Sequence, residues 1–487
     1  MKLLTHYFPA LTLLASATRA DVRVTNLFTD HMVLQRDLAC PVWGLADAGE
    51  KVAVKLGDSK AEATAGADGK WSVKLPAMKM NATGQDLTIS GKNSLIIKDV
   101  LVGDVWVCSG QSNMEMNLGG CNAPEDIASA DLPNIRRIKF PHVSLSKPTT
   151  DVPGKWETTT AQNAGGYTAV GFYFARRVQK ETGVPIGLLD DSWGGTRIEP
   201  WIPVCGFEGE APLAAILDAV KKRDAESAAA PDNKPLDAGQ PVALYNGMIF
   251  PVVPYGIKGA LWYQGESNGG EGDEYFSKMR ALIGGWRKVW DQGDFPFYFV
   301  QLANFQKDAN TPAGGDGWAK LRQAQTKSLQ IPHTGMAVIT DIGEANDIHP
   351  KNKADVGERL ALWALHHDYG KKDVVESGPI FKEAKVEGGK MRVSFDYSGG
   401  GLIVGKKEGR KPVETVAGGK LARFAIAGED KKWVWADAVI DGGSVVVSSP
   451  EVQKPVAVRY AFTMNPEGAN LYNKEGLPAS PFRSDDW

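Results

Sequence analysis

The sequence predicts a mixed α/β protein in which a mostly parallel sheet, covered by helices, is flanked by a β-rich module at each end. Between about residues 99 and 370, apolar runs of strand length alternate with helical patterns, which is typical of a parallel sheet. On either side, short β-rich runs are separated by turn residues. The chain has 487 residues, of which 43% are hydrophobic, so we expect two or three domains.

Residues 1–20 are predicted to be a secretory signal peptide, because Lys2 precedes an apolar stretch that ends in small residues. A frayed, partly apolar terminus is the alternative. The signal predicts a secreted, periplasmic or extracellular protein, and such a compartment allows disulfides. The four cysteines permit three complete pairings, and the sequence does not choose between them: Cys40, Cys108, Cys121 and Cys205.

Two outer segments have β character. Residues 21–98 contain the runs KVAVKLG, KWSVKLP and DLTIS, separated by turn sequences, and predict a small N-terminal β-sandwich-like module. Residues 371–487 contain KMRVSFDY, GGSVVVSSP and PVAVRYAF, and predict a C-terminal β-rich module.

The central segment, residues 99–370, is predicted to be the catalytic domain. Its strand-length runs are DVWVCSG, PIGLLDDSW, IKGALWYQG, FPFYFVQLA and GMAVITDIG. Helical patterns lie between several of them: TAVGFYFARRVQKET, YFSKMRALIGGWRKVW, which Gly284-Gly285 weakens, and KNKADVGERLALWALHHDY. Ligands of such sheets bind beyond the carboxyl ends of the strands, so the residues after each apolar run are the candidates for chemistry.

Composition argues against several partner classes. A net charge of −3 provides no basic field for nucleic acid, and no apolar run of about 20 residues predicts a membrane span. No C-x-x-C spacing suggests zinc or redox chemistry, and we expect neither a metal nor an organic cofactor. The sequence does not indicate an oligomeric state.

Ser112 and His349 are the candidate nucleophile and base. Ser112 lies in a small-residue turn after the run VWVCSG, where its hydroxyl can project, but it needs a base to take its proton. His349 follows the last apolar run, and a neutral imidazole can accept that proton. Taken alone, Ser112 could be an ordinary loop serine, and His349 could be a structural histidine. The other histidines considered lack a comparable setting: His31, His142, His333, His366 and His367.

Two further strand ends carry candidate donors for an oxyanion. Gly194-Gly195 brings bare backbone N–H groups near a ligand, or simply forms a tight turn. Gln264 and Asn268 offer side-chain amides. Glu266, which only accepts hydrogen bonds when ionised, is expected to orient a neighbouring amide or arginine, unless the segment is simply a polar loop.

With these motifs in place, the sequence resembles the sialate O-acetylesterase family of the SGNH (GDSL-like) hydrolases. The matching stretches are VWVCSGQSNMEM, DSWGGTRIEPW, WYQGESN and DIHPKNKADVGERLAL, with HMVLQRD, PVWG and NLYNKEGLPASPFRSDDW nearer the ends. The resemblance implies a three-layer SGNH esterase core flanked by β modules. By motif position it implies Ser112 as nucleophile and His349 as base. It also implies an oxyanion hole from the N–H groups of Ser112 and Gly195 with the Gln264 amide, although Gly194 remains an alternative to Gly195.

One departure concerns the acid that orients His349. Many SGNH enzymes place it three residues before the histidine, where this chain has Asn346. Asp347 is our candidate, with Glu344, Asp341 or a backbone carbonyl as alternatives. A serine–histidine dyad would still work, at reduced rate.

The sequence therefore predicts a secreted serine-dependent carbohydrate O-acetylesterase. Its expected partner is an O-acetylated carbohydrate, first O-acetylated sialic acid, with acetylated xylan or xyloglucan as the alternative. A non-catalytic carbohydrate-binding protein and a GDSL-type lipase are the rivals from other classes. Candidate substrate contacts are Arg197, Trp201 and Asn268.

Overall fold

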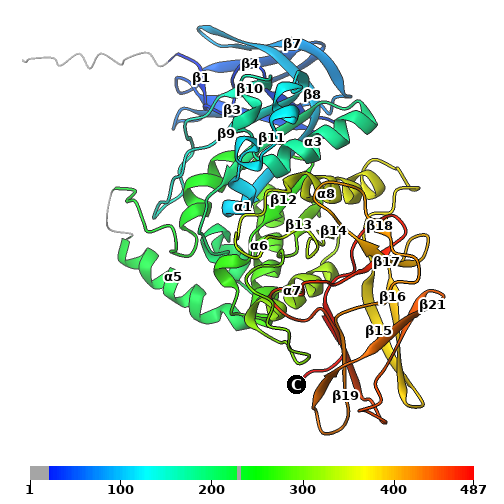
Figure 1. The fold of residues 1–487 in the computed structure, drawn as a ribbon. Helices are drawn as coiled ribbons and strands as arrows, with labels where there is room; N and C mark the ends of the chain where they lie inside the picture. The colour runs from blue at the N-terminus through cyan, green and yellow to red at the C-terminus, as the bar shows by residue number, and fades with distance from the viewer. Residues whose placement is uncertain (1–20, 228–231) are drawn as a thin grey trace, which may run out of the picture.

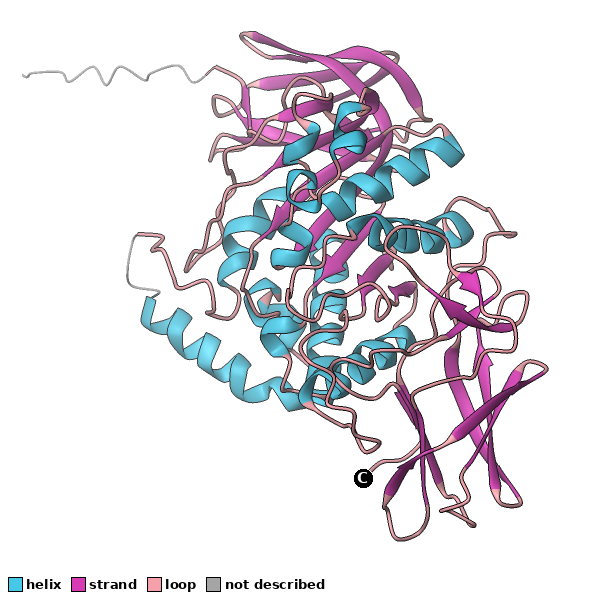
Figure 2. Cartoon of the chain, in the orientation of Figure 1, coloured by secondary structure: helices cyan, strands magenta, loops and turns pink. Residues whose placement is uncertain are grey.

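A computed structural model of the chain describes residues 21–227 and 232–487. They form one large mixed sheet and several smaller β-sheets, with helices gathered around the central part (Figures 1 and 2). The mixed α/β fold expected from the sequence is confirmed. The predicted signal peptide, residues 1–20, lies outside the described residues.

The central part of the large sheet runs in the order β10-β9-β11-β8-β12-β13-β14. Every neighbouring pair from β9 to β14 is parallel, and β10 is antiparallel to β9. The carboxyl ends of the parallel strands therefore share one edge. These strands are β8 (Ser94–Gly110), β9 (Leu132–Lys139), β10 (Trp156–Thr159), β11 (Ile186–Ser192), β12 (Gly259–Tyr263), β13 (Phe297–Val300) and β14 (Thr334–Ala337).

Strand β8 joins the N-terminal β structure to the central sheet. Its first half pairs with β7 and β2, and its second half pairs with β11 and β12. One apolar core extends from Val22 to Ile380 across both parts. The boundary predicted at residues 98 and 99 thus falls inside a continuous strand. The remaining N-terminal strands are β1 (Arg23–Val24), β2 (Val33–Gln35), β3 (Cys40–Leu45), β4 (Lys51–Leu56), β5 (Ser59–Thr64), β6 (Lys70–Leu75) and β7 (Asn81–Ser90).

Helices cover both faces of the parallel strands. Phe297 and Tyr298 are neighbours on β13, so their side chains point to opposite faces. The ring of Tyr298 lies 6.5 Å from that of Trp363 on α8, and the ring of Phe297 lies 5.8 Å from that of Trp286 on α6. The helices are α1 (Ser112–Glu115), α2 (Pro124–Ala128), α3 (Ala169–Thr182), α4 (Val204–Phe207), α5 (Ala214–Ser227), α6 (Asp273–Trp290), α7 (Gly317–Lys327) and α8 (Lys353–His367).

Two glycines allow close helix packing. A Cβ on Gly357 of α8 would lie 2.6 Å from the carbonyl oxygen of Val170, so α8 and α3 touch backbone to backbone on the same face. A Cβ on Gly285 of α6 would lie 2.7 Å from Pro203 Cγ. The Gly284-Gly285 pair, which weakened the helical pattern in the sequence, therefore lies inside an intact helix, and Gly285 has a packing reason to be there, whereas a Cβ on Gly284 would touch nothing.

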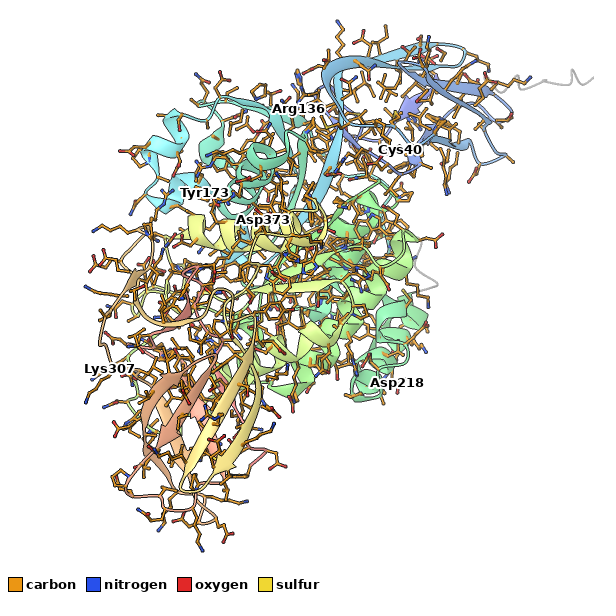
Figure 3. All side chains as sticks on the ribbon, turned by 90° about the vertical axis from the view of Figure 1, so that its right-hand side faces the viewer. Cys40, Arg136, Tyr173, Asp218, Lys307 and Asp373 are labelled. Atoms are coloured by element: carbon orange, nitrogen blue, oxygen red, sulfur yellow. The ribbon has the colours of Figure 1, made fainter. Side chains whose placement is uncertain are left out.

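The residues after α8 form smaller β-sheets with their own apolar core. Figures 1 and 3 show them at the opposite end of the molecule from the N-terminal sheets, where Cys40 lies. Their strands are β15 (Ile380–Glu387), β16 (Lys390–Asp396), β17 (Leu402–Lys406), β18 (Glu414–Thr415), β19 (Phe424–Ala427), β20 (Trp433–Trp435), β21 (Asp437–Asp441), β22 (Ser444–Ser448), β23 (Ala457–Tyr460), β24 (Leu471–Asn473) and β25 (Phe482–Arg483).

The four cysteines, all of them in the described part of the chain, are free thiols, so none of the three possible pairings is formed. Within residues 21–227 and 232–487, no helix has both the length and the apolar character that crossing a bilayer requires.

Candidate active site

Ser112 lies directly beyond the carboxyl end of β8, at the start of the short helix α1. Gly110, the last residue of β8, has φ +133°, and a Cβ there would lie 2.2 Å from Tyr263 O of the neighbouring strand. Only glycine fits that turn. The Ser112 Oγ lies 2.8 Å from Nε2 of His349, a residue 237 positions away in the sequence. The structure therefore brings the predicted nucleophile and base within hydrogen-bond distance.

Asn113, the residue after Ser112, holds the loop that carries His349. Its Nδ2 donates to the carbonyl oxygen of Ile348 at 3.0 Å and to Glu266 Oε1 at 2.6 Å. Glu266 therefore orients a neighbouring amide, the role that its acceptor chemistry suggested. Its second carboxylate oxygen is buried and has no hydrogen-bond partner among the described residues, and burial raises the pKa of Glu266.

Lys353, the first residue of α8, holds the same loop from the other side. Its Nζ donates to Asn113 Oδ1 at 2.7 Å and to the carbonyl oxygen of Pro350 at 2.6 Å. The side chain is fully buried, and this burial lowers the pKa of Lys353 to about 8. The backbone on both sides of His349 is thus fixed by one buried Glu266–Asn113–Lys353 network.

The electrostatic setting favours a neutral imidazole. Partial burial lowers the pKa of His349 below its usual 6.5, the positive charge of Lys353 lowers it further, and Asp347 acts in the opposite direction. A neutral ring can accept the Ser112 proton, so this shift keeps the base in its active form to lower pH.

Asp347 lies beside His349 without a direct hydrogen bond to its ring. Asp347 Oδ1 is 3.7 Å from His349 Nδ1, too far for such a bond, and instead accepts the backbone N–H of His349 at 2.8 Å. Its Oδ2 accepts from Lys351 Nζ at 2.9 Å, and this contact lowers the pKa of Asp347.

The two alternative acids are committed elsewhere. Asp341 forms a bidentate ion pair with Arg359, with contacts of 2.6 and 2.8 Å. Glu344 accepts the backbone N–H of Lys351 at 2.7 Å. Of the three acids that the sequence left open, Asp347 is the one beside the ring.

Two backbone N–H groups lie at the same edge of the sheet, just after β8 and β11. Gly195 has φ +77°, a conformation that favours glycine, and a Cβ there would touch nothing. The N–H groups of Ser112 and Gly195 donate to no acceptor in residues 21–227 and 232–487. Gly194 N–H, by contrast, donates to Glu115 Oε2 at 2.6 Å. Between the two glycines, Gly195 therefore retains a free donor.

Gln264 does not offer its amide to the site. It is fully buried, and its Nε2 donates to Asn268 Oδ1 at 2.7 Å and to Gln111 Oε1 at 3.1 Å. The expectation of a direct oxyanion donor is therefore wrong for this structure, because the N–H groups are used inside the protein. Gln264 instead positions Gln111, the residue before Ser112.

The candidate substrate contacts differ in exposure. Trp201 is fully buried, and its Nε1 donates to Thr196 Oγ1 at 3.0 Å, so the expectation that it stacks on a sugar is wrong. Asn268 is also buried and donates to Glu199 Oε2 at 3.2 Å. Only Arg197 reaches solvent.

Arg197 is paired with acids. Its side chain is 42% exposed, and its guanidinium forms ion pairs with Glu199 and Glu271. It also donates to the carbonyl oxygen of Ser267 at 3.0 Å. Lys278 contacts both glutamates and also Glu274, so two cations pair with three carboxylates here.

A stacked pair of aromatic rings, which the sequence did not reveal, lies beside the nucleophile. The His142 and Trp193 rings are stacked, with centroids 4.4 Å apart and planes within 7°. His142 Nε2 is 2.7 Å from Glu115 Oε1, and the other oxygen of Glu115 accepts from Gly194. A Cβ on Gly194 would lie 3.1 Å from Ser112 Cβ, so this group borders the Ser112 side chain. Trp193 was visible within the DSWGG motif, but His142 lies in a loop without a pattern.

The comparison with known families agrees with this geometry. A family model described as a carbohydrate esterase, sialic acid-specific acetylesterase, matches residues 102–366, a segment that contains Ser112, Gly195 and His349. The chain belongs to this family. It is therefore a carboxylic ester hydrolase.

Relatives that carry acetylesterase names cover three quarters or more of the chain. Human sialate O-acetylesterase is 29% identical over 513 residues, which cover 94% of this chain and 92% of the human protein. The rat sialate O-acetylesterase is 30% identical over 421 residues, which cover 75% and 77%. Among solved structures, a carbohydrate acetylesterase from Xanthomonas citri is 39% identical, with a TM-score of 0.84, and the match covers 96% of this chain and 100% of that one.

Proposed function

We propose that the chain hydrolyses O-acetyl esters of sugars with Ser112 as nucleophile and His349 as general base. The observation that carries this proposal is the 2.8 Å contact between Ser112 Oγ and His349 Nε2 at the carboxyl edge of a parallel sheet. Membership of an acetylesterase family supports the acetyl group as the acyl portion of the substrate.

In the proposed reaction, His349 Nε2 accepts the Ser112 proton while Oγ attacks the acetyl carbonyl carbon. The oxyanion of the tetrahedral intermediate accepts hydrogen bonds from the N–H groups of Ser112 and Gly195. Collapse of the intermediate releases the sugar, whose oxygen takes the proton from His349. Water, deprotonated by the same imidazole, then attacks the acetyl-Ser112 ester. Acetate leaves as the Oγ–carbon bond breaks, and Ser112 Oγ takes the proton back from His349. This sequence needs neither a metal nor an organic cofactor.

Asp347 has a supporting role in this proposal. Its carboxylate lies at ion-pair distance from the ring and holds the backbone of His349, so it favours the imidazolium formed during the reaction. Because it is half-exposed and does not bond Nδ1, we assign most of the catalytic power to a serine–histidine dyad.

The first candidate substrate is O-acetylated sialic acid, as in the curated relatives. A neutral O-acetylated saccharide, such as acetylated xylan or xyloglucan, is the second candidate, and one observation favours it. Arg197 is neutralised by Glu199 and Glu271, so it brings no unpaired charge for a sialate carboxylate. We propose that the exposed part of the Trp193–His142 pair takes the sugar-binding role expected of Trp201, because aromatic faces pack well on sugar rings.

The finer architecture is also a proposal. The helices on both faces of the parallel strands support a three-layer SGNH core over about residues 99–370. The separate apolar core after α8 supports a C-terminal module over residues 371–487. We also propose that the protein is secreted, and this proposal rests only on the sequence pattern of residues 1–20.

Acetate release from O-acetyl sialic acid and from acetylated xylan, measured side by side, tests the substrate. Wild type should release acetate from at least one, and Ser112→Ala from neither. Hydrolysis of octanoyl but not acetyl esters would instead indicate a lipase. If the protein binds the sugar but releases no acetate, either from the sugar or from p-nitrophenyl acetate, it is a non-catalytic binding protein.

A further inference from the structure

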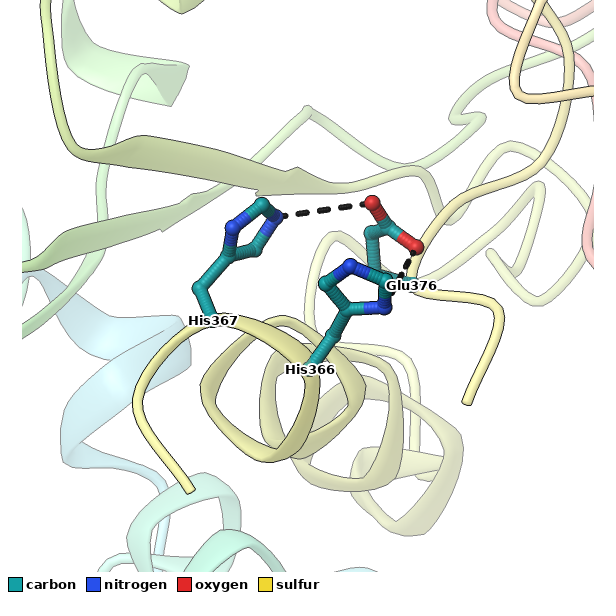
Figure 4. Close-up of side chains that lie close together, drawn as sticks. All are labelled: His366, His367 and Glu376. Carbon is teal, nitrogen blue, oxygen red and sulfur yellow. Dashed lines mark ion pairs between the residues drawn. The ribbon is translucent and has the colours of Figure 1, made fainter. Parts of the chain in front are cut away.

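A cluster of metal-ligating side chains lies at the far end of helix α8 from the catalytic loop. His366 and His367 are the last residues of α8, and Glu376 follows in the segment that leads to β15. Each offers one ligand atom, and these atoms lie within 4.8 Å of one another (Figure 4). Residues 21–227 and 232–487 contain no other such group of three histidine, cysteine or acidic side chains.

The carboxylate of Glu376 is enclosed without a strong cation beside it. Its side chain is 12% exposed, and its oxygens lie 3.3 Å from His366 Nδ1 and 3.4 Å from His367 Nε2. No lysine or arginine in the described part of the chain forms an ion pair with it. A largely buried carboxylate is stable when a positive charge is supplied, and a bound cation would supply it.

Both imidazoles are held in orientations that suit ligation. His366 Nδ1 lies 2.7 Å from the carbonyl oxygen of Val374, which can only accept a hydrogen bond. This contact fixes the tautomer and leaves the lone pair on Nε2, the arrangement usual for metal-binding histidines. The His367 ring is stacked on Trp363, with centroids 5.5 Å apart and planes within 14°.

We propose that His366, His367 and Glu376 bind a divalent transition-metal cation, with zinc the best match to two imidazoles and a carboxylate. At zinc bond lengths, neighbouring ligands of a tetrahedron are about 3.3 Å apart. The 3.4 Å between His367 Nε2 and Glu376 Oε1 already has this spacing. Water completes the coordination. The cation links the end of α8 to the segment before β15, so it stabilises the junction between the catalytic part and the C-terminal sheets. This proposal is independent of the esterase mechanism.

The test is to titrate the metal-stripped full chain with Zn²⁺. Binding is measured by calorimetry, and the thermal unfolding temperature is measured with and without the metal. Wild type should bind one equivalent at this cluster and unfold at higher temperature with the metal than without it. Co²⁺ should give the visible absorption of a low-symmetry, nitrogen- and oxygen-ligated site. His367→Ala and Glu376→Gln should each lose the metal-dependent shift in unfolding temperature and the cobalt spectrum.

Two controls separate this site from others. His333→Asn replaces an exposed histidine outside the cluster and should bind as wild type does. His349→Ala removes the imidazole beside Asp347, one of the histidine–carboxylate pairs outside the cluster, and should keep the shift. Circular dichroism of each metal-free variant establishes that it folds. The proposal is overturned if wild type shows no saturable binding, or if binding survives unchanged in folded His367→Ala and Glu376→Gln.

Discussion

The proton acceptor of the reaction is a half-exposed imidazole whose pKa is set by its partial burial and by charged neighbours of both signs. Partial burial and buried Lys353 lower the pKa of His349, while Asp347 raises it. Since only the neutral ring accepts the Ser112 proton, kcat/KM should rise with pH through a value below 6.5.

Replacing Lys353 by methionine tests this electrostatic account. Lys353→Met removes the positive charge that lowers the His349 pKa, so the acid limb of the kcat/KM profile should move to higher pH. The profile is measured with a soluble acetyl ester whose leaving group does not titrate in this range. Lys180→Met, an exposed lysine on α3, is the matched control and should leave the limb in place. An unmoved limb in a folded Lys353→Met protein would contradict the account.

Replacing Asp347 should lower kcat only moderately. An acid that hydrogen-bonds the catalytic histidine can be worth about 10⁴ in kcat. Because Asp347 stands 3.7 Å from Nδ1 and is exposed to solvent, Asp347→Asn should cost far less than that, and less than Ser112→Ala or His349→Ala. Steady-state kinetics of the three variants decide this. Equal losses in all three would show that Asp347 is a full member of a triad.

At the scale of elements, the loop between β14 and α8 depends on the residue after the nucleophile. Asn113→Ala removes the bonds to Ile348, Glu266 and Lys353 together, and leaves Glu266 and Lys353 buried without their shared partner. A misplacement of His349 by about 1 Å is expected to lower kcat on the order of 10²-fold. KM should change little, because Asn113 lies below the surface of the site.

Kinetics with circular dichroism test this prediction. The conservative variant Asn113→Asp keeps the acceptor oxygen for Lys353 and should retain more activity than Asn113→Ala at the same degree of folding. A purely structural role would lower the unfolding temperature of Asn113→Ala and leave kcat of the folded fraction unchanged.

The sequence predicted five parallel strands of the sheet well. The second half of β8 and all of β11, β12 and β13 are buried, largely apolar runs, and so is most of the edge strand β14. Strand β9 was not predicted, because Arg136 and Arg137 interrupt its apolar pattern. Both are buried all the same: Arg136 pairs with Asp99, and Arg137 lies 4.7 Å from the centroid of the Tyr167 ring. Such partners come from other elements and cannot be read from the strand itself.

The site was predictable to the same extent. Ser112, His349 and the Gly194-Gly195 pair became candidates because they follow strand ends, and the preference for Gly195 came from the family resemblance. Gln264 and Trp201 were misassigned because their type suits a ligand site, whereas their burial depends on the tertiary packing. His142 was missed because a loop has no periodicity that could place it beside Trp193.

At the scale of the whole molecule, the sheet contains a stability cost that depends on pH. Asp191 of β11 is fully buried with neither oxygen hydrogen-bonded within the described residues, and burial, followed by the charge of Asp190, raises its pKa well above 3.8. Above the pKa of this carboxyl group in the unfolded chain, the unfolded chain releases a proton that the folded protein retains. The free energy of unfolding therefore falls as pH rises.

Asp191→Asn should therefore stabilise the fold near neutral pH, because it removes the ionisation and keeps the shape. The gain should shrink as pH falls toward the unfolded pKa of about 4. Thermal unfolding across this pH range measures it, and Asp218→Asn on exposed α5 is the control (Figure 3). A pH-independent difference would contradict the assignment.

The account as a whole depends on a long-range encounter, in which parallel topology brings residues 237 positions apart to one edge of the sheet. Peptide mapping by mass spectrometry after treatment with a serine-directed fluorophosphonate tests it most directly. We predict a single adduct on Ser112 that abolishes activity and that fails to form in folded His349→Ala. Labelling of a different serine, or an Ser112 adduct that forms equally fast without His349, would contradict it.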